Sequence, residues 1–131
     1  KKYRIYFFGG GKHEVETLDN WVSQIPNSEN VAGKLSLKEE LLKIAGLEIM
    51  ISMDSANMHL ASLVGTRCIS VWGATHPYAG FLGYGQHEDD VIQVKDLTCR
   101  PCSVFGDKKC YRGDWACLHE INIQQVIDKI Q

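Results

Sequence analysis

The stretch that decides the fold occupies residues 47–65 and reads LEIMISMDSANMHLASLVG. Its first seven residues, Leu47 to Met53, are β-branched and other apolar residues with a single charge. A glycine precedes them and Asp54 follows, which is typical of a strand buried in a parallel sheet. The next residues predict a short helix at about 57–64 that ends at Gly65. A buried strand that leads directly into a helix is the building unit of α/β domains.

The same alternation of strand and helix continues on both sides of this stretch. Ser36 and Glu39 have the spacing of a capping box, which predicts that a helix begins between them. A short extended piece is expected at residues 31–33. The complete pattern predicts strands near residues 4–8, 47–53, 68–72 and 91–94, and helices near 14–24, 37–45, 57–64 and 123–130. We therefore expect an α/β fold with a mostly parallel sheet flanked by helices.

Length and charge limit the classes of function. A chain of 131 residues is long enough for one domain, and we treat residues 1–131 as a partial domain of a longer polypeptide. Fourteen basic and sixteen acidic side chains give a net charge of -2, which argues against a nucleic-acid partner. No apolar run approaches the roughly 18 residues of a membrane span, and the first residues give no reason to expect a secretory signal.

Three segments are candidates for chemistry, because each follows a predicted strand where ligands of parallel sheets bind. The first, Gly9 to Glu14, joins a strand to a helix and has three consecutive glycines. It fits a backbone that approaches a ligand closely, and equally a tight turn. The third, Gly73 to Pro77, fits a turn built by glycine and proline. None of them matches a Walker phosphate loop, a dinucleotide fingerprint or a hydrolase nucleophile elbow.

The second segment, Asp54 to His59, gives the strongest signal for a ligand. Asp54 or Ser55 is a suitable N-cap for the helix that follows, which is a purely structural role. His59 lies on the first turn of that helix, where a histidine is often simply packed. An acidic residue, a hydroxyl and an imidazole at one helix start nevertheless suit an anion, since backbone amides and the positive helix end bind phosphate oxygens.

Five cysteines leave more than one interpretation open. Cys68 stands alone, whereas the other four fall within a Cys-rich segment at residues 99–117. Free thiols, a disulfide and structural zinc are all compatible with the four, although the spacing of the last pair is wider than in common zinc knuckles. Scattered cysteines without a signal peptide favour a reducing compartment.

Taken together, the motifs resemble those of the lipopolysaccharide heptosyltransferases of glycosyltransferase family 9. The family pattern D-[ST]-G-x-x-H-L-A matches Asp54 to Ala61, and its G-T and G-x-T-x-P elements match Gly65-Thr66 and Gly73 to Pro77. The match continues in the opening Gly10-Gly11-Lys12-His13-Glu14, in Ala32 to Leu37, in Cys99-Arg100-Pro101-Cys102, and in Cys110 and Cys117-Leu118.

The resemblance implies a GT-B glycosyltransferase, of which this chain is most of the Rossmann-like, donor-binding C-terminal half. The donor would be a nucleotide sugar, commonly ADP-heptose, and a lipid-linked saccharide would be the acceptor. The general base is expected in the absent N-terminal half, so we expect the chain alone to be inactive. The resemblance also implies a cytoplasmic location, compatible with peripheral association at the inner membrane face, and neither a metal nor a cofactor.

The residues that the resemblance assigns to the donor have distinct roles. Glu14 would hold the ribose, beside Gly10 and Gly11, and Ala32 to Leu35 would lie beside the base. The diphosphate and the sugar would meet the remaining residues. The complete donor-binding set is Gly10, Gly11, Glu14, Lys34, Leu35, Asp54, Ser55, Ala56 and His59.

One departure from the family pattern concerns Ala56, which stands where the family usually has glycine. It makes nucleotide-sugar transfer a firmer expectation than heptose transfer. Two other functions stay open: a non-catalytic nucleotide-binding or interaction module stapled by its cysteines, with or without zinc, and a nucleotide-sugar epimerase. The Cys-rich segment argues against the epimerase.

Overall fold

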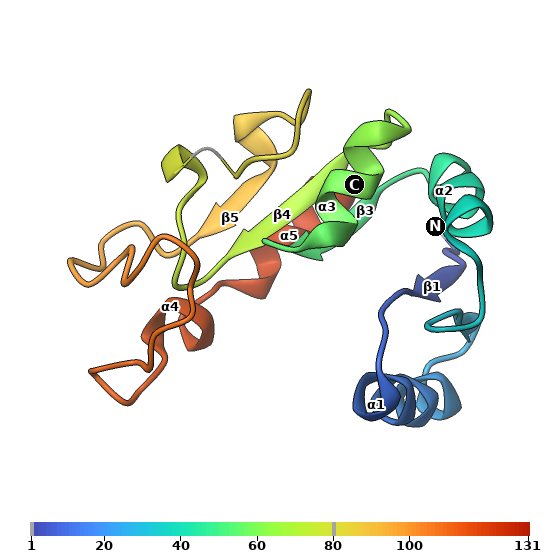
Figure 1. Ribbon diagram of the computed structural model, residues 1–131, viewed down its shortest axis with the longest axis horizontal. Coiled ribbons are helices and arrows are strands. Elements are labelled where there is room, and N and C mark those ends of the chain that lie inside the picture. The colour runs from blue at the N-terminus through green and yellow to red at the C-terminus, as the bar shows by residue number, and fades with distance from the viewer. Residues whose placement is uncertain (1, 80) are drawn as a thin grey trace. The chain divides into compact units, whose positions relative to one another are not determined.

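The computed structural model describes residues 2–79 and 81–131 of the chain (Figure 1). The chain divides into two compact units, Lys1–Lys43 and Ile44–Gln131, and each unit is described by itself.

The first unit contains a pair of parallel strands with a helix between them. Strand β1 (Ile5–Phe7) leads through the glycines into helix α1 (Lys12–Gln24), and strand β2 (Ser28–Asn30) then pairs with β1. Gly11 begins the helix with a φ of 84°, a left-handed conformation that favours glycine. The structure confirms the strand and the helix predicted at this end of the chain, and the parallel register makes them part of a strand–helix–strand unit.

Strand β2 lies three residues earlier than the extended piece expected at residues 31–33. Asn27 adopts a left-handed φ of 61°, so the chain reverses at once and the strand begins at the next residue. Val31 still donates its backbone N–H to the carbonyl of Phe7, after which the chain enters a turn. The predicted position of the extended piece was wrong because the turn at Asn27 lets the strand begin at Ser28.

Helix α2 (Leu37–Ala45) has the predicted bounds and the predicted capping box. The carboxylate of Glu39 accepts hydrogen bonds from the Ser36 backbone N–H at 2.8 Å and from the Ser36 hydroxyl at 2.6 Å. The Glu39 N–H donates to the Ser36 hydroxyl at 3.4 Å. The two bonds to the carboxylate, the one from the Ser36 hydroxyl first, hold the pKa of Glu39 below its usual value.

The second unit contains three parallel strands in the order β3 (Met50–Met53), β4 (Cys68–Trp72) and β5 (Val91–Gln93). Helix α3 (Ala56–Leu63) follows β3 and packs against β3 and β4 (Figure 1). The core of this unit is apolar: its most deeply buried side chains include Ile44, Met58, Ile69 and Trp72. Parallel strands flanked by helices confirm the α/β class.

The connection from β4 to β5 contains two short 3₁₀ helices, η1 (Pro77–Ala79) and η2 (Glu88–Asp90). Strand β3 begins three residues later than predicted, because Leu47 donates to the Ile44 carbonyl in the turn that ends α2. After β5 the Cys-rich segment leads to helix α4 (Ala116–His119), which was not predicted. Helix α5 (Ile123–Ile130) matches its prediction and is capped by the Asn122 side chain. No helix of the described residues has the length and apolar character that a membrane crossing requires.

Candidate functional site

The start of α3 lies at the carboxyl edge of the β3–β4–β5 sheet. Ser55 is the N-cap residue, in an extended conformation, which confirms one of the two N-caps predicted for this helix. Its side chain does not cap the helix, however, because the Ser55 hydroxyl pairs with the Ser52 hydroxyl at 3.0 Å. The first amides of α3 are therefore left without a capping side chain among the described residues, as an anion-binding helix start requires.

The side chains around this helix start are accessible. Ser55, Ala56 and His59 are exposed, and Asp54 is half-buried. The first turn of α3 contains no acidic residue, so no carboxylate within it neutralises the positive end of the helix. A negatively charged ligand can thus approach both the amides and the imidazole of His59.

The segment after β4 lies at the same edge of the sheet. Met53 pairs with Val71 in the parallel register, so the chain beyond Trp72 emerges beside the start of α3. Gly73 and Thr75 are buried there. A Cβ atom on Gly73 would come within 2.6 Å of the Leu118 side chain of α4, which explains why a glycine occupies this position.

Part of the Cys-rich segment is fastened to this edge. The backbone N–H of Cys102 donates to the Ala74 carbonyl at 3.0 Å, and the guanidinium of Arg100 donates to the Gly73 and Thr75 carbonyls. From the sequence alone, Arg100 belonged only to the motif Cys99-Arg100-Pro101-Cys102 and had no predicted role. Its signal is weak, because the acceptors lie more than 20 residues away along the chain.

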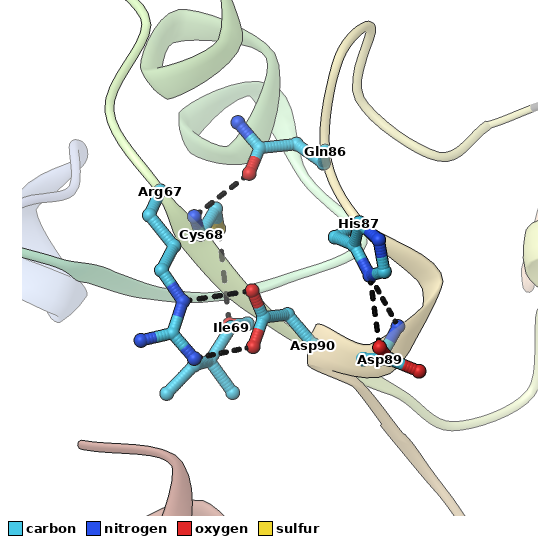
Figure 2. Close-up of polar contacts among 7 residues, drawn as sticks. All are labelled: Arg67, Cys68, Ile69, Gln86, His87, Asp89 and Asp90. Atoms are coloured by element: carbon cyan, nitrogen blue, oxygen red, sulfur yellow. Dashed lines mark hydrogen bonds and ion pairs between the residues drawn. The ribbon is translucent and has the colours of Figure 1, made fainter. Parts of the chain in front are cut away.

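The opposite, amino edge of the sheet is held by a separate polar cluster (Figure 2). Arg67, which precedes β4, pairs with Asp90, which precedes β5. Between them along the chain, the Gln86 amide accepts from the Cys68 N–H and donates to the Thr66 carbonyl and the Ser62 hydroxyl. These contacts anchor the returning end of the β4–β5 connection at the amino edge.

In the first unit, Glu14 closes the glycine loop onto α1. Its carboxylate accepts a hydrogen bond from the Gly10 N–H at 2.8 Å, and a Cβ atom on Gly9 would approach the same carboxylate oxygen to 2.9 Å. Gly10, Gly11 and Glu14 are all exposed. The structure thus brings the predicted glycines and carboxylate together and leaves one further carboxylate oxygen for a ligand.

Lys34 and Leu35 follow β2 in a turn that a buried asparagine organises. The Lys34 ammonium donates to the Asn30 carbonyl at 2.9 Å and lies 3.9 Å from a carboxylate oxygen of Asp19. The Asn30 amide donates to Asp19 at 2.7 Å and accepts from the Ala32 N–H at 3.0 Å. Lys34 is therefore partly engaged within the protein, and Asn30 is a positioning residue that the sequence did not single out.

The predicted site residues thus fall into two groups, one in each unit. Gly10, Gly11, Glu14, Lys34 and Leu35 belong to the first unit, and Asp54, Ser55, Ala56 and His59 belong to the second. Their convergence on a single crevice stays a prediction.

The cysteines are free thiols in the structure. Burial raises the pKa of the Cys68 thiol to about 11, and burial also raises the pKa of the Cys117 thiol. The pKa of the Cys110 thiol is lowered by hydrogen bonds from backbone N–H groups, of which the N–H of Trp115 contributes most. Within the described part of the chain, no three histidine, cysteine or acidic side chains gather in a way that could hold a metal ion. The stapled-module alternative gains no support from this geometry.

Comparison with known proteins identifies the family. The family model described as glycosyltransferase family 9 (heptosyltransferase) matches residues 1–124. Two curated proteins named lipooligosaccharide heptosyltransferase 2 are similar to the chain. One, from Campylobacter jejuni subsp. jejuni serotype O:6 (strain 81116 / NCTC 11828), is 26% identical over 100% of this chain and 41% of its own length.

The second, from serotype O:2 (strain ATCC 700819 / NCTC 11168), is 27% identical over 98% of this chain and 40% of its own length. The chain therefore spans about two fifths of the length of these relatives. No solved structure matches it significantly. The family model covers nearly the whole chain, so the chain belongs to glycosyltransferase family 9, the heptosyltransferase family.

Proposed function

We propose that the full-length protein transfers a heptose from a nucleoside diphosphate to a lipooligosaccharide-type acceptor, and that this chain is part of its donor-binding half. The names of the two relatives support both the sugar and the acceptor class. In this proposal the protein has a GT-B architecture, in which the N-terminal half contributes the acceptor surface and the general base.

The observation that carries the proposal is the start of α3. It lies at the carboxyl edge of a parallel sheet, has no capping side chain among the described residues and presents an exposed histidine one turn in. A nucleoside diphosphate is the leaving group of sugar transfer, and amides with a nearby cation stabilise the charge that develops on it. Amides near Ser55 and Ala56, with His59, are proposed to bind the diphosphate, and Asp54 to bind hydroxyls of the sugar.

The first unit is proposed to bind the nucleoside. Glu14 keeps one carboxylate oxygen on the Gly10 N–H, and the other oxygen is proposed to accept from a ribose hydroxyl. Residues Ala32 to Leu35 form the turn beside which the base would lie. Adenine is the base we expect, because ADP-heptose is the common donor implied by the family motifs.

The reaction itself is a displacement at the anomeric carbon of the sugar. The acceptor hydroxyl oxygen forms a bond to that carbon, and the bond from the carbon to the diphosphate oxygen breaks. The electron pair leaves with the nucleoside diphosphate, and the acceptor proton passes to the base of the other half. The helix start supplies positive potential to the leaving group and His59 donates a hydrogen bond to it, and neither moves a proton.

The proposal is tested with the full-length enzyme and three nucleotides. Calorimetric titration with ADP, UDP and GDP should show that ADP binds at least tenfold more tightly than the other two. Incubation with ADP-heptose and a lipooligosaccharide acceptor lacking its outer heptose should release ADP. Binding of none of the three nucleotides would contradict the proposal; preference for UDP or GDP would retain a nucleotide-sugar transferase but overturn ADP-heptose as its donor.

A further inference from the structure

Arg100 joins the ends of two strands at the carboxyl edge of the second unit. Its Nε donates to the Gly73 carbonyl, and one Nη donates to the Thr75 carbonyl at 2.8 Å, both in the segment after β4. The other Nη donates to the Val94 carbonyl at 2.7 Å, just after β5. A single guanidinium thus spans the two neighbouring strand ends.

The planar fork of arginine is needed for this arrangement. Four acceptors share the side chain: the three backbone carbonyls and the amide oxygen of Gln93, which lies 3.0 Å from an Nη atom. A lysine has one charged nitrogen and cannot reach carbonyls on both strands at once. The site is half-buried, and burial lowers the pKa of Arg100, so the hydrogen bonds replace water that the charged group has lost.

The acceptors of Arg100 are neutral. Three are backbone carbonyls and one is an amide, while the ionisable neighbours that influence the guanidinium are the thiols of Cys117, Cys102 and Cys99. Such bonds direct the carbonyls of Gly73 and Thr75, and among the described residues no carboxylate pairs with the positive charge of Arg100. The charge therefore adds positive potential at the edge where α3 begins.

The segment that Arg100 holds adjoins the proposed diphosphate site. Gly73 to Thr75 follows β4, whose residue Val71 pairs with Met53, and Met53 stands two residues before Ser55. Cys102 and Leu118 contact the same segment at Ala74 and Gly73. If Gly73 to Thr75 shifted, the space available to a ligand at the start of α3 would change.

We propose that Arg100 is a positioning residue for donor binding, which fixes Gly73–Thr75 against the end of β5 and so shapes one wall of the diphosphate site. This inference rests on the proposed function. It also gives part of the Cys-rich segment a role: the residues around Arg100 hold the arginine at the sheet edge, and that role needs neither a disulfide nor a metal.

The test compares substitutions in the full-length enzyme. Arg100→Lys keeps the charge and loses the fork, whereas Arg100→Met loses both. If Arg100 acts by position, both variants should weaken the binding of ADP at least tenfold by calorimetry and raise KM for the donor more than they lower kcat. Asp90→Asn is the matched control, since it removes a polar anchor from the opposite edge of the same sheet and should lower Tm without changing ADP affinity.

Each result decides the inference. Wild-type affinity for ADP in Arg100→Lys would overturn the inference. It would also be overturned if Asp90→Asn lowered ADP affinity as much as the Arg100 variants do while lowering Tm by the same amount. If Arg100→Lys fails to fold, Gln93→Ala removes only one of the four acceptors and should weaken ADP binding two- to fivefold; unchanged binding in that variant would also overturn the inference. Failure of the wild-type enzyme to bind any nucleotide would instead overturn the proposed function.

Discussion

Arg67 and Asp90 form a two-point ion pair that joins the beginnings of strands β4 and β5. The Arg67 Nε lies 2.8 Å from one carboxylate oxygen of Asp90, and an Nη lies 2.6 Å from the other (Figure 2). The Asp90 side chain is 9% exposed, whereas that of Arg67 is 49% exposed. A partly hydrated arginine therefore covers a nearly buried carboxylate at the point where the long β4–β5 connection returns to the sheet.

Removal of the Asp90 charge is expected to destabilise the protein. Asp90→Asn breaks the two-point contact and leaves Arg67 without its carboxylate, which should cost about 2–3 kcal/mol of unfolding free energy, less than for a fully buried pair. Urea denaturation of the full-length protein measures this cost. Asp89→Asn is the control, because the neighbouring Asp89 side chain is 87% exposed and should contribute less than about 0.5 kcal/mol. Equal losses in the two variants would contradict the account.

The same pair predicts a dependence of stability on pH. Hydrogen bonding to Arg67 holds the pKa of Asp90 below its ordinary value. A group whose pKa is lower in the folded state stabilises the fold above its unfolded pKa, about 3.9 for aspartate, and loses that contribution as pH falls through the folded pKa. The difference in unfolding free energy between wild type and Asp90→Asn should be constant from about pH 5 to 8 and shrink below about pH 4. A difference that grows with acidity would contradict this sign.

His59 is expected to contribute to the chemical step. In the full-length enzyme, His59→Ala should cost on the order of 2–4 kcal/mol in donor binding or transfer, because it removes charge stabilisation from the leaving diphosphate. Steady-state kinetics with ADP-heptose measures the effect. His119→Ala removes an exposed histidine of α4 and should leave both kcat and KM near wild type. Unchanged activity of His59→Ala would remove His59 from the site.

Glu14 is expected to act on affinity rather than on the rate. Glu14→Ala should raise KM for the donor and weaken ADP binding by about 1.5–3 kcal/mol with little change in kcat, because the ribose lies away from the bond that breaks. Glu14→Gln separates two causes: its amide oxygen can still accept from the Gly10 N–H, so the loop keeps its shape while the charged acceptor is lost. Calorimetry with ADP should show weakened binding in both variants; wild-type affinity in Glu14→Gln would indicate that Glu14 only shapes the loop.

The sequence predicted those elements of the fold whose limits have a local chemical cause. Helix α2 begins at a capping box, and strand β4 is a mostly apolar run that ends before Gly73, so both had the correct bounds. Helix α4 was missed because its four residues are too few to show a helical period. It begins after Trp115, whose left-handed φ of 51° has no sequence signature.

The candidate site was predictable to a similar extent. The motif around Ser55 correctly placed a helix start after a strand. The strand is buried on one face only, however, because Ile51 and Met53 are exposed, and the side chain of Ser55 bonds to Ser52 instead of capping the helix. The propensity of serine for N-caps cannot reveal that competing partner. Arg100 and Asn30 were not assigned roles, because their partners are brought near by the tertiary fold rather than by the spacing of a motif.

The most direct test of the account is a crystal structure of the full-length protein with ADP. The account predicts that the diphosphate lies against the backbone amides at the start of α3, within hydrogen-bond distance of the His59 imidazole, and that a ribose hydroxyl contacts the Glu14 carboxylate. A diphosphate bound anywhere else, with the start of α3 occupied only by solvent, would contradict the assignment of the donor site.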